Sequence, residues 1–194
     1  AEALVIFFVN SYANNSNEQA AVLAARAVWP NEFVMASSEI LPEIREFERA
    51  STAALNAYLQ PVLGHYLQRL ETALAADGFA GEVLIHQSNG GVMQVGTARR
   101  LPVRTALSGP AAGVVAAGHI AQAAGFENVI TCDMGGTSFD VSVVAGGDHA
   151  ISPQTSIDFG LVIRTPMVEI TTIGAGGGSI AAVDRGGLLR VGPE

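Results

Sequence analysis

The sequence predicts an α/β protein with a β-rich C-terminal part, and three features of its 194 residues support this fold class. Residues 1–36 follow the order strand, helix, strand. Residues 43–77 carry apolar positions at helical spacing. Beyond Gly125 the pattern changes to short apolar segments separated by glycine turns, which is typical of antiparallel strands.

The N-terminal segment has the pattern of one repeat of a parallel sheet layer. Residues 3–9 form a continuous apolar run rich in Val, Ile and Phe, which the polar run NSYANNSN ends. Ser16 is a candidate cap for a helix over 18–29, and Pro30 stops that helix. Residues 32–36 then read as the second strand.

The middle of the chain is mainly helical. Pro61 lies inside the helical stretch 43–77 and predicts a kink or a break there. A strand at 82–86 and a turn at 88–91 follow, and residues 102–107 read as another strand. Ser108-Gly-Pro then opens a helix of small residues, AAGVVAAGHIAQAAG, which allows other backbone to come close.

The C-terminal part is expected to consist of strands. Glycine pairs at 146–147 and 186–187 predict hairpins. The expected strands cover residues 128–133, 139–145, 149–153, 161–170, 180–184 and 188–191.

Composition excludes several classes of function. All ten basic residues are arginine, so the chain has neither a Walker A lysine nor a Schiff-base lysine. A formal charge of −8 argues against nucleic-acid binding. Cys132 is the single cysteine and cannot form an internal disulfide, so a cytoplasmic location is expected. No apolar run is long enough to span a membrane, and the chain, which does not begin with Met, is expected to be a segment of a longer protein.

The clearest chemical pattern is NVITCDMGGTSFDVSVV, at residues 128–144. A strand brings Asp133 to its carboxyl end, residues 134–138 form a tight turn, and a second strand leaves with Asp140. Glycines in such a turn let backbone N–H groups point outward, as phosphate binding without lysine requires. The expected donors of this cradle are Gly135, Gly136, Thr137 and Ser138.

A carboxylate beside bound phosphates is repulsive unless a divalent cation lies between them. Asp133 is therefore expected to hold Mg²⁺ through its water ligands. The alternative is a plain hairpin in which Asp133 and Asp140 are only solvated. In either case Phe139, Val141 and Val143 share one strand face, which we expect to face the core.

Five motifs together resemble the hydantoinase A and 5-oxoprolinase group of the actin-like (ribonuclease H-like) ATPase superfamily. They occur in family order over most of the chain. These motifs are TAALNAYLQP at 52–61, QSNGG at 87–91, PVRTALSGPAAGV at 102–114, NVITCDMGGTS at 128–138 and IGAGGGSIAAVDRGGLLRVGPE at 173–194.

The resemblance implies ATP-dependent hydrolysis of cyclic amides such as hydantoins or 5-oxoproline. ATP phosphorylates a ring carbonyl oxygen in such a reaction. In a sister branch, ketones are carboxylated at the expense of ATP, and a module that binds nucleotide without chemistry is a third reading. The resemblance also implies a second subunit of hydantoinase B type.

By position in the family motif, Asp133 is the catalytic carboxylate that holds metal-bound water. Asp140 is the second catalytic candidate and organises the site. The resemblance places the phosphate cradle at residues 135–138. Cofactors are then ATP and Mg²⁺.

Two departures from the family pattern stand out. Phe139 occupies a position where family members commonly have threonine. A first phosphate loop is absent, so the fragment alone is not expected to turn over. We expect residues 1–80 to end the first lobe and 81–194 to form the core of the second, with the crossover in either the helix at 52–59 or the one after Ser108.

A second glycine loop, GAGGGS, is another candidate site. It offers N–H groups to a nucleotide or a substrate oxygen, or it is simply a sharp bend crossing the sheet. Glu169, just upstream, is a candidate base or a solvated strand-end carboxylate. The cofactor-binding candidates in this loop are Gly176, Gly177 and Gly178.

Overall fold

The computed structural model describes residues 1–157 and 160–192, which divide into two compact units. The lobe boundary expected after residue 80 stays a prediction. Within the described residues, unit 1 holds 1–87, 91–106 and 153–166, and unit 2 holds 88–90, 107–152 and the residues from 167 onward.

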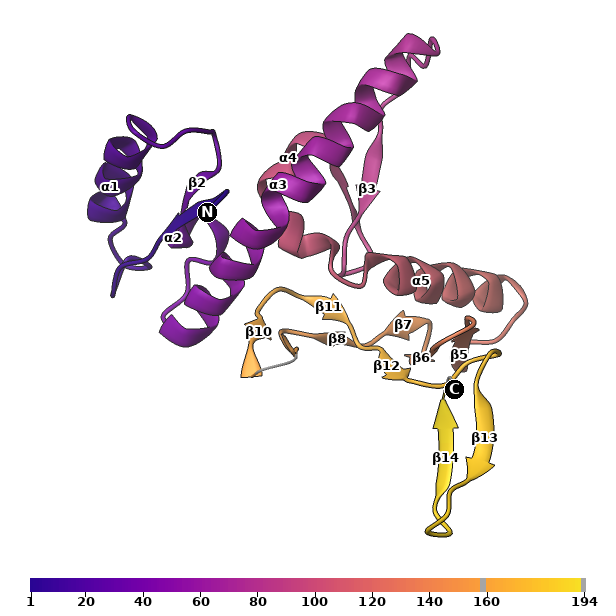
Figure 1. Ribbon diagram of the computed structural model, residues 1–194. Helices are drawn as coiled ribbons and strands as arrows, with labels where there is room; N and C mark the ends of the chain where they lie inside the picture. The colour runs from indigo at the N-terminus through magenta and orange to yellow at the C-terminus, as the bar shows by residue number, and fades with distance from the viewer. Residues whose placement is uncertain (158–159, 193–194) are drawn as a thin grey trace. The chain divides into compact units, whose positions relative to one another are not determined.

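Unit 1 begins with the predicted strand, helix and strand (Figure 1). β1 (Leu4–Ile6) and β2 (Val34–Ala36) pair in parallel, and α1 (Ser16–Arg26) connects them. Val22 of α1 packs against the sheet and is fully buried. The parallel pairing confirms the expected order, although β1 is shorter than residues 3–9.

α1 begins two residues before the predicted start at residue 18, and its cap lies one residue earlier than expected. Ser16 is the first helical residue, and Asn15 occupies the cap position. Asn14 Oδ1 accepts hydrogen bonds from the N–H and the hydroxyl of Ser16 at 3.0 and 2.8 Å. The serine hydroxyl is therefore bonded to the preceding turn and does not cap the helix.

A long helix forms the middle of unit 1. α2 (Ser37–Ile40) precedes α3 (Glu46–Ala76), which runs unbroken for 31 residues with Pro61 in its interior. Pro61 has no N–H to donate to the carbonyl of Ala57, so one helical hydrogen bond is missing. The expected break does not form. In the described residues, no helix combines the length and apolarity that a membrane span needs.

The strand expected at 102–107 is wrong. After the hairpin of β3 (Leu84–His86) and β4 (Val92–Gln94), the chain forms α4 (Val95–Arg100) and the 3₁₀ turn η1 (Pro102–Thr105). The fully buried side chain of Asn56 accounts for this corner. It accepts the N–H of Val103 at 3.2 Å and donates to the carbonyl of Arg100 at 3.1 Å, so these backbone groups need no strand partner.

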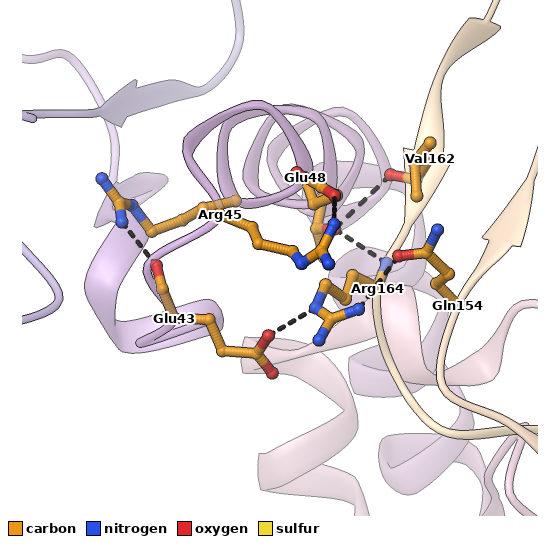
Figure 2. A network of polar contacts seen from close by, with 8 residues as sticks. Glu43, Arg45, Glu48, Gln154, Val162 and Arg164 are labelled. Atoms are coloured by element: carbon orange, nitrogen blue, oxygen red, sulfur yellow. Dashed lines mark hydrogen bonds and ion pairs between the residues drawn. The ribbon is translucent and has the colours of Figure 1, made fainter.

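Residues 153–166 return to α3 and belong to unit 1. They carry the antiparallel pair β9 (Thr155–Ser156) and β10 (Val162–Ile163). Ser51 Oγ accepts the N–H of Val162 at 2.8 Å, and Thr52 Oγ1 accepts the N–H of Arg164 at 2.9 Å. Figure 2 shows the Arg164 guanidinium between the side chains of Glu43 and Gln154, which both accept its hydrogen bonds.

Unit 2 places α5 (Ser108–Ala123) along a small antiparallel sheet (Figure 1). Its strand order is β12, β6, β5, and β7 also pairs with β6. The hairpins expected at 146–147 and 186–187 are confirmed, and the last two residues of the C-terminal motif, Pro193 and Glu194, lie outside the described residues. The strands are β5 (Val129–Met134), β6 (Phe139–Ala145), β7 (Asp148–His149), β8 (Ile151–Ser152), β11 (Met167–Val168), β12 (Thr171–Ile173), β13 (Ile180–Val183) and β14 (Leu189–Gly192).

The sheet face that packs on α5 is the opposite of the one expected. Val143 is 54% exposed, whereas Ser142 and Val144 are 4% and 3% exposed. Val144 packs with Ala111 and Val114 of α5. Polar Ser142 lies on this covered face because its hydroxyl donates to the carbonyl of Glu169 at 2.6 Å. The small residues of α5 leave room for such side chains.

A fully buried carboxylate, Glu18, joins three segments of unit 1. Its Oε1 accepts the N–H of Phe8 at 3.0 Å and the hydroxyl of Ser37 at 2.7 Å. Its Oε2 accepts both the N–H and the hydroxyl of Ser38, at 2.9 and 2.5 Å. Burial by itself raises the pKa of Glu18, but the hydrogen bonds from Ser38, Ser37 and Phe8 outweigh it and hold the pKa below its usual value.

Glu18→Gln is expected to weaken this junction by about 2 kcal/mol, because the amide directs donors at groups that already donate. The measurement is the local opening free energy of α1 and β2 from hydrogen exchange in the full-length protein. Since the folded pKa is lowered, the ionised Glu18 stabilises above about pH 4.5, the ordinary value, and loses that effect as the pH falls. The difference between wild type and variant should therefore shrink below pH 4.5.

Glu39→Gln is the matched control, because Glu39 is exposed and accepts one hydrogen bond, from Gln19. It is expected to change the same opening free energy by less than about 0.5 kcal/mol. Equal effects of the two substitutions would contradict the role given to Glu18.

Candidate functional site

The predicted turn between two strands is present and closes β5 and β6 into a hairpin. Asp133 pairs with Asp140, and Met134 pairs with Phe139. The N–H of Gly135 donates to the carbonyl of Ser138 at 3.0 Å. Residues 135–138 therefore form a four-residue turn, named the 135–138 turn below, at the end of a regular antiparallel ladder.

Three successive N–H groups of the turn have no partner in the part of the chain that the structure describes. They belong to Gly136, Thr137 and Ser138. The first two residues are exposed and Ser138 is half-buried, so bulk solvent reaches them. Successive unpaired N–H groups attract an anion, and a phosphate is the anion that the sequence predicts here.

The carbonyl groups of the same turn are bound by residues 174–179, named the 174–179 loop. The N–H of Gly177 donates to the carbonyl of Gly135 at 2.9 Å, and the N–H of Gly178 donates to the carbonyl of Gly136 at 2.8 Å. Gly176 donates its N–H to Ser179 Oγ at 2.8 Å. Two glycine-rich segments thus meet backbone to backbone.

This contact corrects one expectation. The N–H groups of residues 176–178 are not unobstructed, because all three donate within the chain. Gly176, Gly177 and Gly178 can therefore contribute to nucleotide binding only indirectly, by holding the 135–138 turn. This indirect role stays a proposal.

Three polar side chains form a row across the sheet beside the turn. Asp133 of β5 stands opposite Asp140 of β6, which in turn stands opposite Thr172 of β12. The Thr172 hydroxyl donates to Asp140 Oδ1 at 2.5 Å. Two carboxylates at paired positions repel each other, and a cation bound to them relieves that repulsion.

Helix α5 comes close to this row of polar side chains at Gly113. A Cβ on Gly113 would lie 3.9 Å from Asp133 Oδ2. The helix backbone is therefore near this carboxylate, and a larger side chain at position 113 would crowd it.

The residues present fit a magnesium ion that keeps most of its water. The described residues contain no group of three or more His, Cys, Asp or Glu that could hold a metal. Two carboxylates and one hydroxyl are a small donor set, which suits Mg²⁺ because it is commonly held by one or two carboxylates, waters and substrate phosphates.

Two other residues near the site lie at the surface. Cys132 is exposed, since it lies on the sheet face that α5 does not cover. Glu169 is exposed, and its backbone N–H donates to Ala150 at 2.8 Å. Its role as a base stays a prediction.

Sequence reasoning missed Thr172 and Ser179. Thr172 follows from the pairing of β12 with β6, which local patterns do not reveal. Ser179 ends the glycine run GAGGGS, and a hydroxyl residue next to several N–H groups was the available signal.

Residues 49–194 of this chain match the Hydantoinase_A family, which is described as hydantoinase/oxoprolinase. The chain belongs to this family. The match includes both glycine segments and the row of polar side chains. It confirms the resemblance that the sequence motifs indicate.

Two related sequences and two solved structures extend the comparison. The caprolactamase subunit alpha of Pseudomonas jessenii is 42% identical over 100% of this chain, and the 5-oxoprolinase of Saccharomyces cerevisiae is 34% identical over 100%. The solved ATP-dependent caprolactamase matches with a TM-score of 0.80 and 43% identity over 95% of this chain and 26% of its own. A nucleotide-free acetone carboxylase matches with a TM-score of 0.80 and 27% identity over 100% of this chain and 28% of its own.

These matches confirm the predicted fold class, an α/β part of the actin-like ATPase fold with a β-rich C-terminal part. The chain spans 28% of the caprolactamase subunit and 15% of the yeast 5-oxoprolinase. Relatives that are named as subunits include caprolactamase subunit alpha and the acetone carboxylase beta subunit of Xanthobacter autotrophicus.

Asp133→Asn is expected to stabilise the β5–β6 hairpin by roughly 0.5 kcal/mol when Mg²⁺ and nucleotide are absent, because it removes one of two facing charges. Hydrogen exchange of the hairpin amides in the full-length protein measures this change. Asp148→Asn is the matched control, since Asp148 pairs with Ala145 and has no carboxylate opposite it. Equal exchange in the two variants would contradict the repulsion.

Proposed function

We propose that this chain is the phosphate-binding part of an ATP-dependent enzyme that hydrolyses a cyclic amide. The observation that carries the proposal is the set of unpaired N–H groups at Gly136, Thr137 and Ser138 beside two carboxylates. Family membership supports the reaction class. The relatives named caprolactamase and 5-oxoprolinase support a cyclic amide as substrate.

An amide carbonyl resists attack by water because the nitrogen lone pair is delocalised into it and the amine is a poor leaving group. Transfer of a phosphoryl group from ATP to the carbonyl oxygen makes the carbon more electrophilic, and water adds to it. The C–N bond then breaks as the nitrogen takes up a proton, which opens the ring, and a second water hydrolyses the resulting acyl phosphate to a carboxylate and phosphate. The N–H groups of the 135–138 turn hold phosphate oxygens and stabilise the charge that develops on them. Bound Mg²⁺ supplies the positive charge that allows carboxylates and phosphates to lie together.

The two carboxylates have different roles in this proposal. Asp133 holds the water shell of the magnesium ion and lies next to the helix backbone at Gly113. Asp140 is fixed by the Thr172 hydroxyl and orients the same shell from the neighbouring strand. Residues 176–178 act by holding the turn.

Ketone carboxylation is the second candidate, and the acetone carboxylase structure favours it because its match covers 100% of this chain. There, ATP activates bicarbonate or the ketone instead of an amide. A non-catalytic nucleotide-binding module is the third candidate.

The proposal includes a partner subunit of hydantoinase B type. It also includes a cytoplasmic location, because the single Cys132 offers no internal disulfide.

The deciding experiment measures ADP release by the full-length protein together with its partner subunit. Hydantoin, 5-oxoproline, caprolactam, or acetone with bicarbonate is added in separate reactions with ATP and Mg²⁺. Stimulation by a cyclic amide, at least ten-fold over ATP alone, supports the amide hydrolase. Stimulation by acetone with bicarbonate selects the carboxylase, and equal release in all reactions selects the binding module.

Asp133→Asn is expected to lower substrate-dependent ADP release by about 100-fold or more, since loss of one group that stabilises transition-state charge costs about 3 kcal/mol. Asp148→Asn, on the far end of the same sheet, is the charge-matched control and should retain the wild-type rate. Unchanged release by Asp133→Asn would remove the metal role given to this residue.

A further inference from the structure

We propose that Gly176 and Gly178 are positioning residues that aim the N–H groups of the 135–138 turn at the phosphates. They act through the turn and touch no ligand themselves. The inference rests on the proposed function for the identity of the ligand. The contact between the two glycine segments is independent of that function.

The first step is steric, because these two glycines leave no room for a side chain. A Cβ on Gly176 would lie 2.5 Å from the carbonyl oxygen of Gly135 and 2.9 Å from that of Gly136. A Cβ on Gly178 would lie 2.9 Å from the oxygen of Gly136. Each obstructing atom belongs to backbone, so no flexible side chain can move aside.

The reason for glycine here is space and not backbone conformation. Neither Gly176 nor Gly178 has a positive φ. Gly177 between them is different, because its Cβ would lie 3.7 Å from the oxygen of Gly135, an ordinary contact distance. Gly176 and Gly178, on either side of Gly177, thus lie too close to the 135–138 turn for a side chain.

The second step follows from the planar trans peptide. In a trans peptide the C=O of one residue and the N–H of the next point in opposite directions. The chain has no cis peptide in its described residues. The N–H groups of Gly177 and Gly178 hold the carbonyls of Gly135 and Gly136 toward the 174–179 loop. The N–H groups of Gly136 and Thr137, which share these peptide planes, therefore point away from the loop.

The aim of these donors thus depends on how closely the two segments approach. A methyl group at position 176 or 178 forces them apart, and the hydrogen bonds from Gly177 and Gly178 lengthen or break. The peptide planes of the 135–138 turn can then rotate, and their N–H groups lose a common direction. Phosphate affinity falls, while contacts to the adenosine part of a nucleotide are unaffected.

The test compares glycine-to-alanine variants in the full-length protein. Gly176→Ala and Gly178→Ala carry the clash, and Gly177→Ala carries only the ordinary contact. Gly192→Ala is the matched control, because a Cβ there meets nothing within 4 Å and the position lies outside the site. Ser179→Ala is a milder variant that removes the acceptor of the Gly176 N–H and adds no clash, for use if an alanine variant does not fold.

Two readouts are measured for each variant. Calorimetry gives Kd for ATP with Mg²⁺ and Kd for adenosine, and hydrogen exchange gives the protection of residues 134–139. Gly176→Ala should weaken ATP binding roughly ten-fold or more and adenosine binding less than two-fold, with faster exchange in the turn. The effect should decrease from Gly176→Ala to Gly178→Ala to Gly177→Ala, and Gly192→Ala should match wild type.

Some outcomes overturn the inference. If Gly176→Ala leaves the exchange of 134–139 unchanged, or if ATP and adenosine weaken equally, the two glycines do not aim the turn. For Ser179→Ala, unchanged ATP affinity together with unchanged exchange has the same meaning. If wild type binds no ATP, the proposed function fails, whereas the exchange data still decide whether the loop holds the turn.

Discussion

The site depends on one backbone contact, in which the 174–179 loop binds the carbonyl groups of the 135–138 turn. Two hydrogen bonds, at 2.9 and 2.8 Å, hold the carbonyls on one side. Because each peptide plane carries a carbonyl and an N–H that point in opposite directions, the unpaired N–H groups of Gly136 and Thr137 lie on the other side. Without the hydrogen bonds from the 174–179 loop, the turn would have the same residues, but its N–H groups would have no fixed direction.

The same unit places charge where folding alone would avoid it. Asp133 and Asp140 occupy paired positions, and facing carboxylates destabilise a strand pair. The structure tolerates them because α5 is thin near Gly113 and because Thr172 donates to Asp140. Local rules of stability are broken here beside a set of unpaired N–H groups, which is a combination expected of a functional site.

The sequence predicted features that depend on neighbouring residues. The 135–138 turn and the hairpin around it follow from two alternating segments separated by Gly-Gly, and the N-terminal strand, helix and strand follow from periodicity. The sequence could not predict features set by distant partners. The corner at 102–105 depends on the buried side chain of Asn56, and the covered face of the sheet depends on α5.

One strand register accounts both for the row of polar side chains and for the contact between the 174–179 loop and the 135–138 turn. β12 pairs with β6 so that Thr172 meets Asp140 and Ile173 meets Phe139, the first residue after the turn. Residues beyond Ile173 must then run beside the 135–138 turn, which brings Gly176 and Gly178 against its carbonyls. A slip of one residue would turn Thr172 to the opposite face and misalign the glycines as well. Because a single pairing fixes both features, a change that shifts β12 should disturb the row of polar side chains and the 135–138 turn together.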